Sequence, residues 1–315
     1  MIRSLVIGSR GSKLALAQAE LIRAELVRLN PDVEIRIEVI KTTGDVKSDP
    51  LSVIGGKGVF TKELEEALLD GRIDIAVHSL KDLPTIIPDG LQLGAIGTRE
   101  DAHDALVLRH DTQQTKVSLS HLPPNAVVGT SSPRRAAQLK YLRRDVLIKD
   151  LRGNIDTRLR KLDEGEYDAL ILAAAGLRRL GIETRISGII SAEEMLPAVG
   201  QGAIGLETRS DDQFAIAIAS KANDITTSLA CTGERALLRA LGGGCQLPIA
   251  GHAVVSGDQI RIEGLVTDSA GTRLVRDHIS GASNKAESIG AQLGERLLER
   301  GAKLLLSESG LDFRP

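Results

Sequence analysis

Two hydrophobic periods alternate along the first hundred residues of the chain. Apolar residues recur every three or four positions over 14–27 and 59–69, which is typical of amphipathic helices. Apolar and charged residues alternate over 33–40, which predicts a half-buried strand, and the short apolar runs at 5–7 and 73–77 predict buried strands. This order of strands and helices predicts a largely parallel sheet with helices on its faces.

A second set of α/β elements follows. Strands are expected at 126–128, 146–148 and 169–172, and helices at 132–143, 155–162 and 173–180. Pro133 suits the first position of a helix because its missing N–H would have no partner there. The segment 201–207 is expected to form a strand that returns to the first sheet.

The last ninety residues have a different pattern. A helix over 227–241 is expected to end at the glycines 242–244. Three strands near 249–255, 259–266 and 273–279 and a helix near 285–300 are then expected. This pattern predicts an α+β module with an antiparallel meander.

Length, charge and composition narrow the classes of function. A chain of 315 residues suggests two or three domains. With 40 Lys+Arg against 42 Asp+Glu, the net charge gives no reason to expect DNA or an anionic membrane as the main partner. Three Phe, two Tyr and no Trp make a base-stacking platform improbable. Because 27 of the basic residues are arginine, forked recognition of carboxylate or phosphate groups is favoured.

Cysteine content and hydropathy indicate a cytoplasmic protein. Cys231 and Cys245 are too few for a disulfide framework or a four-thiolate zinc site. The N-terminus has no signal-peptide core, and the longest uncharged run, near 169–177, is shorter than the roughly 18 residues of a membrane span. His78 has no second ligand at metal spacing, so no metal site is expected.

Three predicted strand-to-helix turns, at 8–12, 129–135 and 151–154, are rich in Gly, Ser, Thr and Arg. Each offers hydroxyl or backbone N–H groups at a helix N-terminus, where the dipole favours anions. One such turn alone would be read as a helix cap beside solvated arginines, but three together favour an anion-binding cleft. None fits a P-loop or G-x-G-x-x-G, which disfavours a nucleotide. The Gly-rich loop 42–58 is a candidate binding loop, or else a disordered connection.

Two residues are candidates for chemistry. Asp82 follows the predicted strand 73–77, in the region where open α/β sheets bind ligands, and could be a general acid–base or cation-stabilising group. The alternative is a turn residue before Pro84. Cys245 lies in a Gly-rich turn that leaves its thiol accessible, although loop cysteines are often neutral, whereas Cys231 is expected to pack inside a helix.

With these motifs the chain resembles the porphobilinogen deaminase family. The motifs keep the family's order from residue 10 to residue 248: Arg10-x-Ser12-x-Leu14-Ala15-Leu16-x-Gln18, Gly55-Gly56-Lys57-Gly58-x-Phe60, Ala76-Val77-His78-Ser79-x-Lys81-Asp82-x-Pro84, Gly129-Thr130-Ser131-Ser132-x-Arg134-Arg135, Leu151-Arg152-Gly153-Asn154 with Thr157-Arg158, and Gly243-Gly244-Cys245-Gln246-x-Pro248. The resemblance implies an α/β fold of three domains, of which domains 1 and 2 resemble type II periplasmic binding proteins and domain 3 is a small α+β module. The expected bounds are 1–98 with 202–222, 103–197, and 223–315.

The resemblance also implies an activity. Enzymes of this family join four porphobilinogen molecules head to tail, release ammonia at each step, and hydrolyse the product to hydroxymethylbilane in tetrapyrrole biosynthesis. The chain of rings grows on a dipyrromethane cofactor that is bound through a thioether to a cysteine, which by motif position is Cys245. The expected partners are porphobilinogen and the growing oligopyrrole, with no nucleic acid and no membrane, and the protein is expected to be a monomer.

The resemblance assigns roles to individual residues. The catalytic positions are Asp82, Lys81 and Arg10, and Asp82 is expected to be a buried carboxylate that stabilises the azafulvene cation left when ammonia departs. The cofactor-binding positions are Cys245, Asp82, Lys81, Ser79, Thr130, Ser131, Arg134, Arg135, Arg152 and Gly153. The substrate-binding positions are Arg10, Ser12, Gln18, Arg152, Arg158, Arg179, Gln201, Lys57 and Phe60. Arg143 and Arg144 fall outside the pattern and are expected to be solvated.

The abundance of arginine now has an explanation, because every pyrrole ring of these compounds carries an acetate and a propionate. Pro133 and Asp156 depart from the family's pattern, and Asp156 adds negative charge near an anion site. A competing hypothesis is a non-catalytic, cytosolic small-anion-binding module of periplasmic-binding-protein-like fold, since fold does not determine function. Cys245 and Asp82 favour the enzyme, because a pure binding module requires neither.

Overall fold

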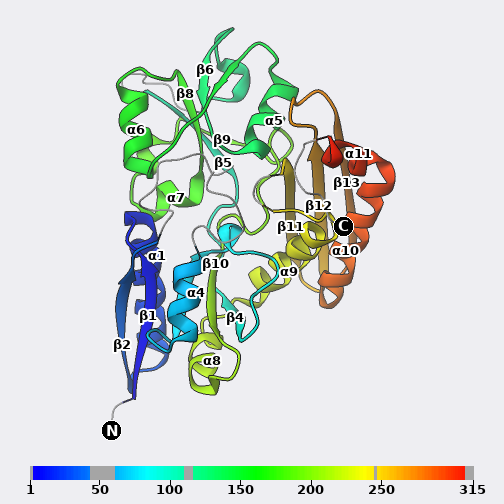
Figure 1. Cartoon of the computed structure of the whole chain (residues 1–315). Coiled ribbons are helices and arrows are strands. Elements are labelled where there is room, and N and C mark those ends of the chain that lie inside the picture. Colours follow the sequence, from blue (N-terminus) through cyan, green and yellow to red (C-terminus); the bar gives the residue numbers. More distant parts are fainter. Residues whose placement is uncertain (1–2, 43–60, 110–115, 245–246, 309–315) are drawn as a thin grey trace. The chain divides into compact units, whose positions relative to one another are not determined.

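The computed structural model describes residues 3–42, 61–109, 116–244 and 247–308 (Figure 1). The chain separates into two compact units, one of Met1–Glu100 with Ala203–Ser228 and one of Asp101–Gly202 with Leu229–Pro315. Helix α9 (Ile225–Ala240) begins in the first unit and continues in the second. Among the described residues, no helix combines the length and the apolar character that a membrane crossing requires.

The first unit is built on a mixed five-stranded sheet. In spatial order its strands are β2 (Val33–Ile40), β1 (Arg3–Arg10), β3 (Ile75–Ser79), β10 (Ile204–Arg209) and β4 (Leu91–Ile96). Strand β1 runs parallel to β2 and β3, whereas β10 runs antiparallel to β3 and β4. The predicted return of the chain after residue 201 is therefore confirmed, and β10 lies between two strands that precede it by more than a hundred residues.

Helices cover both faces of this sheet. Along β1, Leu5 and Ile7 pack with α1 (Lys13–Leu29) and α8 (Gln213–Ser220), whereas Val6 packs with α4 (Lys62–Leu69) on the other face. Successive side chains of a strand point to opposite faces, so a strand buried on both sides reads as a continuous apolar run. This is why residues 5–7 could be recognised as a buried strand.

The second unit contains a five-stranded sheet with the same pattern of strand directions. Its strands in spatial order are β7 (Leu147–Lys149), β6 (Val127–Gly129), β8 (Ala169–Ala173), β5 (Asp104–Leu108) and β9 (Gly188–Ile190). Three strands are parallel, and β5 is antiparallel to both of its neighbours, as β10 is in the first unit. The helices that follow the parallel strands are α5 (Pro133–Leu142), α6 (Ile155–Asp163) and α7 (Ala174–Arg179).

The second unit also contains a smaller α+β part. Its antiparallel sheet has the strand order β11 (Ile249–Ser256), β12 (Gln259–Thr267) and β13 (Leu274–Ala282). The sheet packs with α9, α10 (Ala286–Leu297) and α11 (Lys303–Ser307) around a core that includes Leu237, Ile262 and Leu293. A Cβ on Gly290 would lie 2.0 Å from the Gly233 carbonyl oxygen, so glycine is required where α9 and α10 touch.

The α/β class and the α+β module with its meander are confirmed, and two details of the sequence analysis are wrong. The first five-stranded sheet is mixed rather than largely parallel, because β10 runs against both of its neighbours. The strand expected at 73–77 runs from Ile75 to Ser79, so His78 and Ser79 lie within β3 and not beyond it. The division into three domains stays a prediction.

Candidate active site

The carboxyl edge of the first sheet carries several of the predicted residues. Strands β1 and β3 are parallel, so Arg10 at the end of β1 and Ser79 at the end of β3 lie at the same edge. This is the edge at which open α/β sheets bind ligands. Ser12 begins α1, and its hydroxyl accepts a hydrogen bond from the backbone N–H of Ala15 at 3.3 Å. Ser12 is therefore a helix cap, whatever else it binds.

Gln18 and Ser79 lie in direct contact. The Gln18 amide nitrogen donates to the Ser79 hydroxyl at 3.0 Å, and that hydroxyl lies 3.1 Å from the Gln18 amide oxygen. Gln18 is buried on α1. The structure thus brings a predicted substrate residue together with a predicted cofactor residue and fixes the end of β3 against α1.

The predicted catalytic residues Lys81 and Asp82 lie on a single turn of 3₁₀-helix, Leu80–Asp82. The backbone N–H of Leu80 donates to the carbonyl oxygen of Ala203 at 3.0 Å, and the Leu80 side chain is buried. Lys81 is half-buried and Asp82 is exposed, which differs from the buried carboxylate that was expected. The reason is local, since Leu80 and Leu83 occupy the inward positions of the turn.

In the second unit, the ends of β6 and β7 are joined by a serine. The Ser131 hydroxyl donates to the Leu151 carbonyl oxygen and accepts a hydrogen bond from the Leu151 N–H at 3.0 Å. Beside it, the Thr130 hydroxyl accepts from the Ser132 N–H at 3.2 Å. Ser132 caps α5, and Pro133 occupies the first position of that helix, as predicted. The two predicted turns at 129–135 and 151–154 are therefore neighbours.

Arg134 and Arg135 converge on a buried carboxylate that the sequence analysis missed. Arg134 Nη1 donates to Asp104 Oδ2 at 2.7 Å, and Arg135 Nε and Nη2 donate to Asp104 Oδ1 at 3.0 and 2.8 Å. The amide nitrogen of Gln201 donates to the same Oδ1 at 2.9 Å. The Asp104 side chain is 0% exposed and the two arginine side chains are 5% and 8% exposed. Sequence offers little signal for this pairing, because Asp104 looks like a polar residue at the start of an apolar run.

Positive charge exceeds negative charge in this network, and this lowers the pKa of Asp104. Burial alone would raise the pKa of Asp104, but the charges of Arg134 and Arg135 outweigh burial and keep that pKa well below its usual range. Asp104 is therefore ionised at neutral pH. Two guanidinium charges facing one carboxylate leave one net positive charge in a buried network.

Gln201 and Arg179 fix the chain at 201–202. The Gln201 amide nitrogen also donates to the Ala102 carbonyl oxygen at 2.7 Å, and Arg179 Nη2 donates to the Gly202 carbonyl oxygen at 2.6 Å. Both residues were predicted to bind substrate. The structure shows that both also make contacts to backbone oxygens within the second unit.

Two more of the predicted arginines follow β7, Arg152 in the turn and Arg158 on α6. Arg152 Nε donates to the Asp150 carboxylate at 2.9 Å, and Arg158 Nε donates to the Gly153 carbonyl oxygen at 2.7 Å. Gly153 has φ +109°, and a Cβ there would lie 2.8 Å from Thr157, so glycine is required at this position. Asn154 occupies the cap position of α6 without a side-chain capping hydrogen bond.

The expectation that Arg143 is solvated is wrong. Its guanidinium donates to the carbonyl oxygens of Leu119 and Leu122 at 2.6 and 2.8 Å and binds the Asp145 carboxylate at 2.7 Å. The arginine satisfies backbone oxygens of the 3₁₀ turn Leu119–His121, a long-range contact with no local sequence signal. Arg144 is exposed, as expected.

Three predicted residues, Cys245, Lys57 and Phe60, lie outside the described residues. Cys231 is buried in α9, as predicted. Of the predicted residues of the second unit that the structure describes, all except Gln201 follow β6, β7 and β8, whose carboxyl ends lie at one edge of the sheet.

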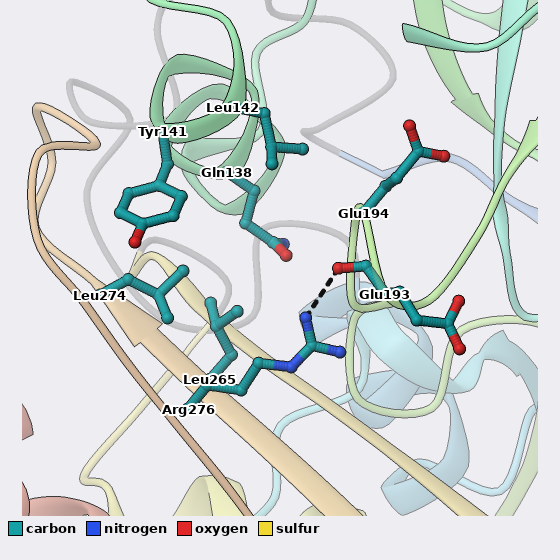
Figure 2. Close-up of a pocket in the computed structure, with 8 residues that line it drawn as sticks. All are labelled: Gln138, Tyr141, Leu142, Glu193, Glu194, Leu265, Leu274 and Arg276. Carbon is teal, nitrogen blue, oxygen red and sulfur yellow. Dashed lines mark hydrogen bonds between the residues drawn. The ribbon is translucent and has the colours of Figure 1, made fainter. Parts of the chain in front are cut away.

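Figure 2 shows a cavity of about 200 Å³ in the second unit, lined by Gln138, Tyr141, Leu142, Glu193, Glu194, Leu265, Leu274 and Arg276. None of these belongs to the predicted site. The Gln138 amide bonds the backbone of Leu196, and the Arg276 guanidinium bonds the Glu193 carbonyl oxygen at 2.8 Å. Two of its polar groups thus have partners within the protein, and the cavity adds no chemistry to the site.

The residues present suit a group rich in carboxylates. A dipyrromethane carries an acetate and a propionate on each ring, and each needs a cationic or N–H partner when it leaves water. In the network of Asp104, Arg134 and Arg135 two positive charges face one negative charge, and the α5 N-terminus adds the favourable end of a helix dipole. The cofactor fits this edge of the second unit by charge.

Comparison with known proteins extends these observations to the whole chain. A family model described as "Porphobilinogen deaminase, dipyromethane cofactor binding domain" matches residues 5–217, and "Porphobilinogen deaminase, C-terminal domain" matches residues 228–299. The chain is 48% identical over 307 residues to the porphobilinogen deaminase of Pelobacter propionicus, which covers 97% of each protein. It is also 48% identical over 313 residues to that of Chlorobium luteolum, which covers 98% of each.

Among solved structures, a similar one is the probable amino-acid ABC transporter extracellular-binding protein ytmK of Bacillus subtilis. It has a TM-score of 0.43 at 13% identity, over 70% of this chain and 90% of that one. The VFT2 domain of Bordetella pertussis BvgS has a TM-score of 0.43 at 16% identity, over 74% and 91%. The two family models and the full-length relatives show that the chain belongs to the porphobilinogen deaminase family.

Proposed function

We propose that this protein is a hydroxymethylbilane synthase (EC 2.5.1.61). It condenses four porphobilinogen molecules head to tail, releases one ammonia per step, and hydrolyses the tetrapyrrole to hydroxymethylbilane. The observation that carries the proposal is the full-length similarity to named porphobilinogen deaminases. The arginine-rich carboxyl edge of the second unit supports it, because substrate and product bear two carboxylates on every ring.

The cofactor-binding residues of the proposal are those that the resemblance to the family assigns. When bound, the dipyrromethane supplies the pyrrole carbon to which the first substrate is joined, and Cys245 is proposed as its thioether attachment. Arg134, Arg135 and Arg152 are proposed to bind its carboxylates. For the first two, the role is supported by the network with Asp104, in which two positive charges face one negative charge.

Asp82 is proposed as the catalytic carboxylate. Loss of ammonia from porphobilinogen leaves an electron-poor azafulvene cation, which a nearby negative charge stabilises most in the transition state. The carboxylate stands on a turn whose backbone is fixed to Ala203, and Lys81 and Arg10 lie at the same edge. An exposed carboxylate on a fixed turn is available to a substrate without rearrangement of the chain.

The proposal also covers the domain organisation, the cellular location and the substrate-binding residues. It comprises three domains with the bounds given above, a cytoplasmic monomer, and substrate binding through Ser12, Gln18, Lys57, Phe60, Arg158, Arg179 and Gln201. The partners are porphobilinogen and the growing oligopyrrole, and neither nucleic acid nor membrane is part of the mechanism.

An intact-mass measurement tests the cofactor and its attachment together. The purified protein should exceed its sequence mass by one dipyrromethane, and the Cys245→Ser variant should lose this additional mass. Cys231→Ser is the matched control, since that thiol is buried in α9, and it should keep the added mass and the activity. Added mass on the Cys245 variant would refute the attachment. Wild-type protein with no added mass and no consumption of porphobilinogen would favour the non-catalytic anion-binding module.

A further inference from the structure

A buried histidine–carboxylate pair lies on β3 and β10 next to the proposed catalytic turn. His78 Nε2 and Glu207 Oε2 are 3.0 Å apart, and their side chains are 3% and 0% exposed. Neither residue has a part in the mechanism above. Burying two ionisable side chains costs free energy that ordinary packing would avoid, so their presence in the middle of a sheet calls for a reason.

The pairing of β3 with β10 brings the two side chains together. Gly205 is opposite His78 in the antiparallel register, and Glu207 is opposite Ala76. His78 and Glu207 are therefore diagonal neighbours on one face of the sheet, within reach of long side chains. Ala76 packs in the cluster that α4 covers, so this is the face toward α4.

Among the described residues, one carboxylate oxygen of Glu207 has a hydrogen-bond partner and the other has none. Among the described residues, Glu207 Oε1 is buried without a hydrogen-bond partner, and so is Glu65 Oε1 on α4. Burial and the charge of Glu207 raise the pKa of Glu65, which indicates that the two carboxyl groups are near one another. The imidazole of His78 is thus the only hydrogen-bond partner of the Glu207 side chain among the described residues.

The same two strands determine where Asp82 stands. Besides its backbone pairing with β3, β10 meets this part of the chain through the His78–Glu207 pair, and Ala203, the residue before β10, accepts a hydrogen bond from the Leu80 N–H at 3.0 Å. Only three residues separate His78 from Asp82. A change in the direction of β3 at His78 is therefore passed to the carboxylate with little chain to absorb it.

We propose that His78 and Glu207 are positioning residues, whose buried contact sets the orientation of the β3 end and thereby the place of the Asp82 carboxylate. The inference rests on the proposed function, because it needs Asp82 to act in turnover. Displacing a reacting group by a fraction of an ångström to 1 Å lowers the rate of the chemical step and leaves binding of the ground state nearly unchanged.

The test is a double-mutant cycle on cofactor-loaded protein, with loading checked by mass and folding by circular dichroism. Glu207→Met fills the space of the carboxylate but removes the contact, and should lower kcat about 10–100-fold with KM changed less than about 2-fold. Glu207→Gln keeps the size and a hydrogen bond to His78, and should recover most of this loss. In the Asp82→Asn background, either change at position 207 should have almost no further effect on kcat.

Thr208→Val is the matched control. Thr208 is the next residue of β10, is equally buried and has an unpartnered hydroxyl among the described residues, but it points to the opposite face. The valine variant should turn over like the wild type. If Glu207→Met does not fold, the cycle with Glu207→Gln decides, with a loss of about 3-fold expected in wild type and none in Asp82→Asn.

Two results would overturn the inference, and they differ in what else they overturn. If Asp82→Asn is slow and the position-207 variants slow it further by the same factor as in wild type, the pair is only structural and the proposed function stands. If Asp82→Asn turns over as fast as wild type, the proposed role of Asp82 fails and the positioning role fails with it.

Discussion

Replacing Asp104 by Asn tests whether the buried network in the second unit is a structural requirement of the arginine-rich edge. In the wild type, Asp104 Oδ1 accepts from Arg135 Nε, Arg135 Nη2 and Gln201 Nε2, and Oδ2 accepts from Arg134 Nη1. An asparagine oxygen at the Oδ1 position retains three of these donors. Its NH2 group then faces Arg134 Nη1, which is a donor too, and the two guanidinium charges lose their only counter-charge in the network.

The expected cost is large. Removing one partner from a buried ion pair destabilises proteins by about 3–5 kcal/mol, mainly because the other charge stays buried and unpaired. A folded domain has a total stability of roughly 5–15 kcal/mol, so the change removes about a fifth of it or more. The Arg134 and Arg135 side chains are 5% and 8% exposed, so solvent provides little compensation.

The assay is urea unfolding of the loaded protein, with cofactor content measured by mass on the same sample. Asp163→Asn is the matched control, because Asp163 binds both Nη atoms of Arg185 with similar geometry, at 3.0 and 2.7 Å, but its side chain is 37% exposed. That variant should lose at most about 1 kcal/mol. If Asp104→Asn is no less stable than Asp163→Asn, the network is not the buried ion pair that the geometry indicates.

Four further predictions follow from the contacts described above. Because Asp104 has a pKa below its usual range in the folded protein, the stability that it contributes is present above the unfolded pKa near 4 and is lost as pH falls through the folded pKa. The difference in urea midpoint between wild type and Asp104→Asn should therefore be full at pH 7 and shrink steadily below pH 4. A difference that grows on acidification would contradict this reasoning. Asp82→Asn should lower steady-state porphobilinogen consumption by roughly 10²–10⁴-fold in fully loaded protein, with Asp82→Glu retaining more activity than Asn, and the reverse order would show that Asp82 is only a turn residue. Arg152→Leu should reduce cofactor content or the rate of chain initiation, whereas Leu at the exposed Arg144 should change neither. Arg143→Leu should instead destabilise the protein in urea, because the carbonyl oxygens of Leu119 and Leu122 lose their donor.

Local patterns were enough to predict most elements of the fold. The alternation at 33–40 gave the same bounds that β2 has, and Ser132 with Pro133 marked the start of α5. The glycines after residue 241 marked the end of α9. These signals are readable because strand alternation, helix capping and glycine termination depend on residues within a few positions of one another. The order of the motifs likewise led to the family, which the comparisons confirm.

Elements with weaker local patterns were missed. Strands β4, β5 and β9 and helix α8 were not predicted, and β9 has only three residues. The direction of β5 and β10 also depends on where the chain returns after long excursions, which no local window contains. The assignment of cofactor and substrate residues stays a prediction, since it rests on motif position.

What the sequence determined by itself is most of the helices and strands and the family, whereas the residues assigned to the chemistry stay a prediction. Tertiary structure alone decided which partners such side chains meet: Arg134 binds Asp104 across 30 positions, Arg143 binds the Leu119 carbonyl oxygen although it was expected to be solvated, and His78 meets Glu207 across 129 positions. A charged residue looks the same in a sequence whether it ends in water or in a sheet. The free-energy cost of burying that charge, and the role of the residue, depend on the local dielectric and on the partners that only the folded chain supplies.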